Sequence, residues 1–135
     1  MPEQKVIMNS TFILTAAETT MSQYRVAVLD TTAAGYVINP AAANASNIAG
    51  VLQDSTLAAE DTGNFAVMGI SYVVAFAAIA VGDVLVVGDT AGRVKSKAAG
   101  ATAQGLGVVG IALGSATAQD DIIPCRLQLI NEYGS

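Results

Sequence analysis

The sequence predicts an all-β fold: a compact β-barrel or sandwich made of two similar β units, with an extended N-terminal arm. Short apolar runs recur along the 135 residues, separated by clusters of Gly, Asp, Thr and Ala. Hydrophobic residues make up 53% of the chain and aromatic residues only 5%, so the core must be built from many small side chains. The alanine-rich segments 41–47 and 98–104 lack an apolar stripe of helical period, and we interpret both as loops.

The expected strands follow one another as short runs. They are YRVAVLD, GYVIN, IAGVLQ, NFAVMG, ISYVVAF, DVLVVGD, GRVKS, VVGIAL and IIPCRLQLI. In the last run Ile123, Cys125, Leu127 and Leu129 alternate with other residues and therefore share one face of a strand. Pro124 has no backbone N–H, which predicts that this strand starts or edges its sheet.

Two parts of the chain repeat the same pattern of strands and turns. AVLDTTAAGYVI, with Gly35, is similar to LVVGDTAGRVK, with Gly92. IAGVLQDS around Gly50 is likewise similar to VVGIALGS around Gly110. A polar loop then carries a pair of acids in each copy, Glu60 with Asp61 and Asp120 with Asp121.

These repeats define the expected domain organisation. We predict a single β domain over 21–135 that contains repeat-like units of about 25–69 and 83–129. The stretch 1–20 lies outside the repeat and carries an apolar kernel of Phe12, Ile13 and Leu14. Ordering such a stretch costs conformational entropy. We therefore expect it either to add a strand to its own sheet or to lie on a neighbouring subunit or partner.

Composition argues against an enzyme and against most cofactors. The chain has no histidine and a single cysteine, so His-based triads, Cys–His pairs, most zinc sites and an intrachain disulfide are excluded. The net charge of −5 disfavours nucleic acid as a partner. The most apolar segment, 66–81, is too short for a membrane-spanning helix. We expect no catalytic residue, no metal, no cofactor and no membrane association, and we interpret Cys125 as a core residue.

Two glycine-containing motifs are better explained by turns than by ligand binding. GLGVVG, from Gly105 to Gly110, fits G-x-G-x-x-G, but no buried strand precedes it and no room for a second βα unit follows, so we interpret it as a β turn. GDTAGRV predicts a hairpin in which Gly92 is left-handed and Asp89 bonds its own backbone.

Two surface patterns indicate contacts with other chains. Arg93, Lys95 and Lys97 are spaced to share one strand face, which is either a solvated hairpin face or an attraction for an acidic partner. In ISYVVAFAAIAV, Tyr72 and Phe76 lie on one face and small apolar residues on the other, so both faces need cover. We therefore predict self-association.

From Arg25 to Leu129 the chain resembles the small capsid decoration proteins, or head cement proteins, of tailed bacteriophages. The similar segments are RVAVLD with GYVI, IAGVLQDS, VMGISYVVAFAAIAVGDVLVVGDTAGRV and VVGIALGSATAQDDIIPCRL. The long middle block is the most specific of these.

The resemblance implies a β-rich structural virion protein with no catalytic motif, made in the host cytoplasm and assembled as a homotrimer. It implies that the protein binds the outside of the expanded capsid and stabilises it by bridging major capsid subunits. The expected contacts to the capsid or to other subunits are Phe12, Ile13, Leu14, Tyr72, Phe76, Arg93, Lys95 and Lys97. The alternative is a phage tail or adhesion β-barrel that recognises a glycan or receptor, although the chain has no Trp and few other rings for stacking.

Overall fold

The prediction of an all-β fold is confirmed. The computed structural model describes residues 5–15, 18, 20–97 and 106–132, which form strands and turns, with no helix among them and hence none that could cross a membrane. The strands are β1 (Lys5–Leu14), β2 (Thr20–Ser22), β3 (Val26–Leu29), β4 (Tyr36–Ile38), β5 (Ile48–Leu52), β6 (Thr56–Ala58), β7 (Thr62–Val74), β8 (Val84–Val87), β9 (Val94–Ser96), β10 (Leu106–Ala112) and β11 (Ile122–Glu132).

One large sheet holds nine of these strands, in the order β1-β4-β3-β5-β7-β11-β10-β8-β9. β1 also pairs with β7, so β1, β4, β3, β5 and β7 close on themselves; we call these five strands the first ring. A parallel bridge between Ala75 and Val94 joins the end of β7 to β9. β7, β11, β10, β8 and β9 therefore form a second ring.

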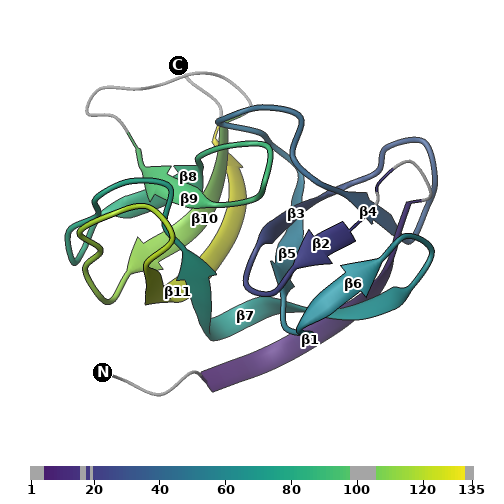
Figure 1. Ribbon diagram of the computed structural model, residues 1–135, viewed down its shortest axis with the longest axis horizontal. Helices are drawn as coiled ribbons and strands as arrows, with labels where there is room; N and C mark the ends of the chain where they lie inside the picture. The colour runs from purple at the N-terminus through teal and green to yellow at the C-terminus, as the bar shows by residue number, and fades with distance from the viewer. Residues whose placement is uncertain (1–4, 16–17, 19, 98–105, 133–135) are drawn as a thin grey trace.

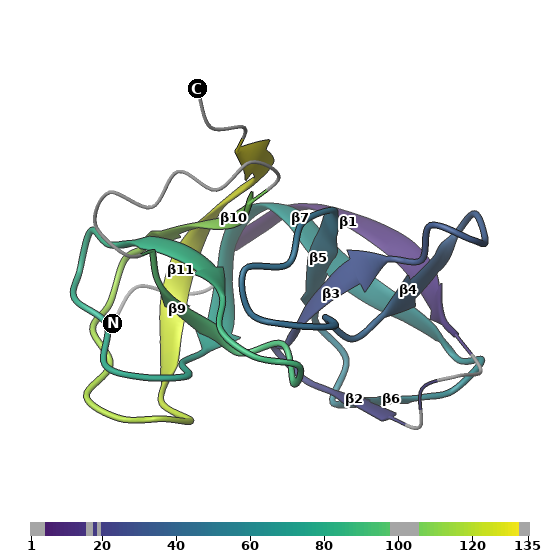
Figure 2. The same cartoon turned by 90° about the horizontal axis from the view of Figure 1, so that it is seen from above.

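β7 belongs to both rings and explains why the two halves form one body. Its first part, from Thr62, pairs with β1 and β5, and its last part, from Ile70 to Val74, pairs with β11. In Figure 1 it runs along the bottom of the molecule from one half to the other. Figure 2 shows the rings side by side, with β8 to β11 on the left and β1 to β6 on the right.

The two rings repeat one pattern of backbone pairing. β4-β3-β5-β7 in the first ring corresponds to β9-β8-β10-β11 in the second. β1 runs parallel to β4 and antiparallel to β7, and the end of β7 has the same two relations to β9 and β11. The pairing of Met21 with Leu57 between β2 and β6 is matched by a bridge between Ile79 and Ala116.

The acidic loops that the sequence comparison equated make identical backbone bonds. In each ring the backbone N–H of one buried residue donates to the backbone oxygen of the second acid, and its backbone oxygen accepts from the N–H of the first acid. The bonds are Leu14 N to Asp61 O (3.0 Å) and Glu60 N to Leu14 O (2.8 Å) in the first ring, and Ala75 N to Asp121 O and Asp120 N to Ala75 O (both 2.8 Å) in the second. Leu14 and Ala75 are therefore equivalent positions, and β1 is the first-ring counterpart of the second part of β7.

The N-terminal stretch contributes a strand to its own sheet. Residues 5–14 form β1, which pairs with β7 from Ile70 to Thr62. Of the two expected locations, the described part of this stretch therefore takes the one within its own chain. Residues 1–4, 16–17 and 19 lie outside the described residues.

Two hydrophobic clusters fill the rings. The larger one consists of Val26, Val51, Ala66, Val73, Ala75, Ile79, Leu85, Val87, Val94, Val109, Ala112, Ala116, Ile123, Cys125 and Leu127. The smaller one, inside the first ring, consists of Leu14, Met21, Ala27, Val37, Ala49, Leu52, Leu57 and Phe65. Aliphatic and alanine side chains dominate both clusters, as the shortage of aromatic residues predicted.

Two local predictions are wrong. The described part of GLGVVG, from Leu106 to Gly110, is not a turn, because it lies inside β10, with Val109 as an extra residue opposite β8. A Cβ at Gly110 would collide with the carbonyl oxygen of Arg126, so a close approach of two strands requires this glycine. Pro124 is the third residue of β11, but that strand lies between β7 and β10 rather than at an edge.

Of the two alanine-rich segments predicted to be loops, the structure tests one. Residues 41–47 form no strand or helix, which confirms their interpretation as a loop, whereas 98–104 lie outside the described residues. Two three-residue strands, β2 and β6, were missed because TMS and TLA are too short to show a period.

Candidate interaction surfaces

The hairpin between β8 and β9 has the predicted geometry. Gly92 takes a left-handed conformation, with a φ of 78°, and Asp89 Oδ1 accepts hydrogen bonds from the backbone N–H groups of Ala91 and Arg93, both at 3.1 Å. The hairpin tip docks on the first ring, because Val26 N donates to Gly92 O at 2.8 Å. GDTAGRV therefore connects the two rings.

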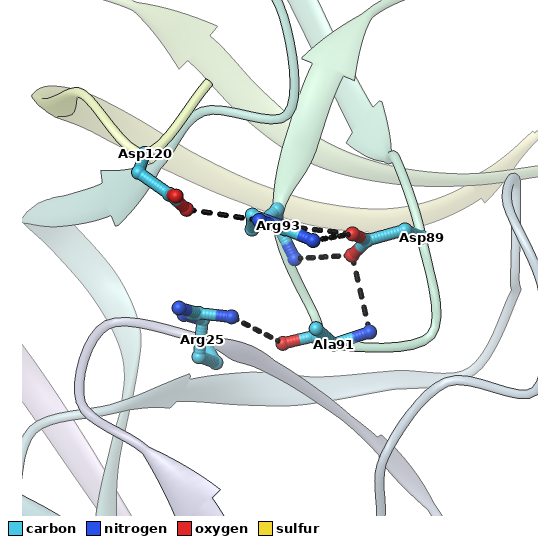
Figure 3. A network of polar contacts seen from close by, with 5 residues as sticks. All are labelled: Arg25, Asp89, Ala91, Arg93 and Asp120. Carbon is cyan, nitrogen blue, oxygen red and sulfur yellow. Dashed lines mark hydrogen bonds and ion pairs between the residues drawn. The ribbon is translucent and has the colours of Figure 1, made fainter.

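Arg93 is held within its own chain by two acids. Its Nη2 lies 2.6 Å from Asp89 Oδ2 and its Nη1 lies 2.9 Å from Asp120 Oδ1, and both carboxylates raise the pKa of the guanidinium. Figure 3 shows Asp89 and Asp120 on opposite sides of Arg93. The guanidinium also sits 5.9 Å from the centroid of the Phe76 ring, which is 37% exposed.

The two lysines of the expected basic face flank a structural serine. Lys95 lies in β9 opposite Val86, Lys97 follows the strand, and both side chains are half-buried. Ser96 Oγ donates to Asp83 Oδ2 at 2.6 Å, which lowers the pKa of that carboxyl. Because Arg93 is already paired with two acids, it offers less charge to a partner than its spacing on this face suggested.

The expected contacts in β1 pack mainly against their own ring. Leu14 is completely buried, and Phe12 packs edge-on against Phe65 with ring centroids 5.7 Å apart. Ile13 is half-buried between its pairing partners Thr62 and Tyr36.

Both faces of β7 near Tyr72 are covered by the chain itself. Tyr72 packs edge-on against Tyr24 with centroids 5.5 Å apart, and its neighbours Val73 and Val74 are both buried. β7 is apolar on both sides because it is shared by two rings. This double cover removes the need for a second subunit at this strand.

Cys125 is a buried core residue, as predicted. It has no exposed surface, and burial raises the pKa of its thiol to about 12. Among the residues that the structure describes, no group of three or more Cys, Asp or Glu side chains could hold a metal ion.

A groove of about 460 Å³ lies where the two rings meet. Residues far apart in the sequence form it, so neither spacing nor composition could have revealed it. The lining combines apolar side chains with arginine, hydroxyl and carboxylate groups. The lining residues are Ser22, Gln23, Tyr24, Arg25, Ser55, Thr56, Val74, Arg93, Asp120 and Ile122.

An apolar patch lies on another part of the surface. It consists of Leu29, Met68 and Ile130, which are 41%, 48% and 57% exposed. Two hollows that share Leu129 and Ile130 connect these side chains over β3, β7 and β11. The alternation of β11 predicts that Ile130 points away from Leu129 and the core, but the sequence does not show that Leu29 and Met68 lie near it.

Comparisons with known proteins show the fold. No protein-family profile matches the chain, and no curated protein matches it in sequence. The crystal structure of the head fiber gp8.5 N base of bacteriophage phi29 is similar to this chain with a TM-score of 0.63 at 17% sequence identity. The similarity covers 90% of this chain and 93% of that one, so the two share nearly the whole arrangement of strands.

Proposed function

We propose that this chain is a structural protein of a bacteriophage virion that binds the outside of the expanded capsid and stabilises it by bridging major capsid subunits. The observation that carries the proposal is the similarity in fold to the base of a phage head fiber, which extends over almost the full length of both chains. The sequence segments similar to head cement proteins support the same class of function independently.

The physical mechanism of this function is burial of surface between subunits. Each Å² of apolar surface removed from water contributes roughly 25 cal/mol. The apolar patch of Leu29, Met68 and Ile130 supplies such surface in this chain. Lys95 and Lys97 add attraction for an acidic capsid surface, which speeds docking and is screened by salt. The resemblance to head cement proteins supports the major capsid protein and further copies of this chain, in a homotrimer, as the partners, whereas the covered faces of β7 do not supply the contact between copies.

Co-sedimentation with expanded, undecorated capsids tests the proposal. We expect the protein to pellet with expanded capsids and not with unexpanded ones, and to raise the temperature at which the heads open. The double variant Met68→Gln, Ile130→Gln should bind fewer copies, whereas Thr117→Ala, at an exposed loop position outside the patch, should bind as the natural protein does. A protein that stays in the supernatant at every salt concentration would exclude capsid binding.

The contribution of the lysines is measured in the same assay. Replacing Lys95 and Lys97 with glutamine should weaken capsid association at low salt and leave the fold intact. Equal binding of both proteins from low to high salt would assign these side chains to an ordinary solvated face.

A further inference from the structure

The groove between the two rings contains an arginine whose charge has no carboxylate partner among the residues that the structure describes. Arg25 lines the groove, and its Nη1 donates to the backbone oxygen of Ala91 at 3.1 Å. Within the described residues it takes part in no ion pair, and its Nε is buried without a hydrogen-bond partner. A partly desolvated guanidinium that is not matched by an acid is unfavourable unless something supplies the missing charge.

The neighbouring acids do not supply it. Asp89 and Asp120 are both directed at Arg93, and Figure 3 shows neither of them turned toward Arg25. Position 25 also differs from its counterpart in the other ring. Leu52 N donates to Arg25 O as Ala112 N donates to Asp83 O, so the second ring has an aspartate where the first has this arginine.

The residue before Arg25 is held in an unfavourable conformation. Tyr24 has a φ of 62°, which costs energy for a residue with a side chain, whereas its second-ring counterpart is Gly82 with a φ of 90°. Tyr24 lines the groove, as do the apolar residues Val74 and Ile122. Ser22, Ser55 and Thr56 add hydroxyl groups to the same lining.

We propose that this groove binds the carboxylate of an acidic side chain from a partner protein, with Arg25 as the residue that pairs with it. A guanidinium presents parallel N–H groups that match the two oxygens of a carboxylate. The hydroxyl groups of Ser22 and Ser55 can donate further hydrogen bonds, and the apolar lining residues suit the methylene carbons of an Asp or Glu side chain. Asp120, whose side chain is 64% exposed at the rim, opposes the incoming negative charge and limits the affinity.

The test uses the isolated protein, so its outcome does not depend on capsid binding. The probes are two peptides, acetyl-Ala-Glu-Ala-amide and acetyl-Ala-Gln-Ala-amide, which differ only in the charge of the central residue. NMR titration follows the backbone amide signals of Ser22, Arg25 and Thr56. We expect the Glu peptide to shift these signals with a Kd about tenfold or more lower than that of the Gln peptide.

Variants assign the effect to the groove. Arg25→Gln should remove the preference for the Glu peptide, whereas Arg126→Gln, which changes the same charge at an exposed position of β11 outside the groove, should keep it. Asp120→Asn should tighten binding of the Glu peptide, because it removes the competing charge; asparagine also tolerates the φ of 74° at this position.

Several results would overturn the proposal. Equal binding of the two peptides, or equal losses in Arg25→Gln and Arg126→Gln, would mean that no specific carboxylate site exists. Tighter binding of glucuronate than of the Glu peptide at the same amides would identify the ligand as an acidic sugar instead. If Arg25→Gln does not fold, Asp120→Asn decides, and an unchanged Kd in that variant contradicts the inference.

Discussion

The two rings share their backbone pattern but fill it with side chains of different sizes. Their equivalent positions follow from matching hydrogen bonds and strand pairings. The first ring places a large residue where the second has a small one in the pairs Leu14 and Ala75, Leu52 and Ala112, Leu57 and Ala116, and Phe65 and Cys125. The same backbone therefore encloses two different sets of core side chains.

The size difference is reversed at other positions of the two cores. Ala27 of β3 corresponds to Leu85 of β8, and the bulge residue Ala49 corresponds to Val109. These two reversals offset only part of the extra side-chain volume that the four larger residues give the first ring. The two cores therefore differ both in total side-chain volume at equivalent positions and in how that volume is distributed among the strands.

The two rings differ at equivalent outward positions. In the first ring these positions are covered by the second ring, whereas in the second ring they meet water. Val26 and Ala66 of the first ring are completely buried in the larger core. Their counterparts on the second ring are Val84, which is 36% exposed, and Arg126, which is exposed. Equivalent backbone positions therefore carry an alanine where the surface is covered and a charge where it meets water.

Reciprocal substitutions give the largest test of this comparison. Leu52→Ala introduces the residue that is native in the second ring and should lower the free energy of unfolding by about 2–5 kcal/mol, because it leaves a cavity beside Phe65. Ala112→Leu is the reverse change and should cost about 1–3 kcal/mol through overpacking. Urea unfolding followed by circular dichroism measures both. If both variants were as stable as the natural chain, the two cores could not be the separately fitted sets described above.

Repetition made much of this architecture predictable from the sequence. The similarity around Gly35 and Gly92, and around Gly50 and Gly110, correctly indicated matching hairpins, because turns and bulges place strict demands on local residues. Residues 5–14 were expected to lie outside the repeat. Their counterpart is the second part of β7, and the sequences KVIMNSTFIL and ISYVV show no obvious similarity although the backbone pairings agree.

The surfaces were less predictable than the strands. The apolar runs located Tyr72 correctly on a strand with two apolar faces, but not the ring that covers each face. Arg93 was expected on a strand face that is either solvated or attractive to an acidic partner, and the spacing did not reveal that it pairs with Asp89 and with Asp120, which lies in another loop. Arg25 gave no signal in the sequence, because its significance depends on where the described carboxylates lie in the fold, and none of them pairs with it. Charged side chains that are far apart in the sequence meet only in the folded chain, so the spacing of residues along the sequence does not show which of them pair.

Two glycines at different kinds of position provide the second test. Gly110→Ala forces a Cβ against the backbone of Arg126 in the bulge that both rings share, and should cost about 1–3 kcal/mol or more because neither strand can move freely. Gly35→Ala meets no atom within 4 Å and carries only the penalty of its left-handed φ of 83°, about 1 kcal/mol. Thermal unfolding of both variants measures the difference. A larger loss for Gly35→Ala would show that turn conformation, and not strand approach, fixes the repeated pattern.

The acidic loop of the second ring gives the smallest expected effect. Asp121 Oδ2 accepts hydrogen bonds from the backbone N–H groups of Thr117 and Ala118, at 2.9 and 3.2 Å, and these bonds lower its pKa below the usual value of 3.8. A carboxyl whose pKa is lower in the folded than in the unfolded chain stabilises the fold above the unfolded pKa. That stability is lost as the pH falls through the folded pKa.

Asp121→Asn should therefore melt at a slightly lower temperature than the natural chain at pH 6, and the difference should shrink as the pH falls toward 3. Asp30 and Asp83, whose pKa values are also lowered by hydrogen bonds, should keep part of the acid dependence in the variant. Glu60→Gln, an exposed charge change in the corresponding loop of the first ring, serves as the control for net charge. Melting temperatures measured from pH 6 to pH 3 decide the matter: parallel curves for Asp121→Asn and the natural chain would mean that the Asp121 carboxylate does not hold this loop.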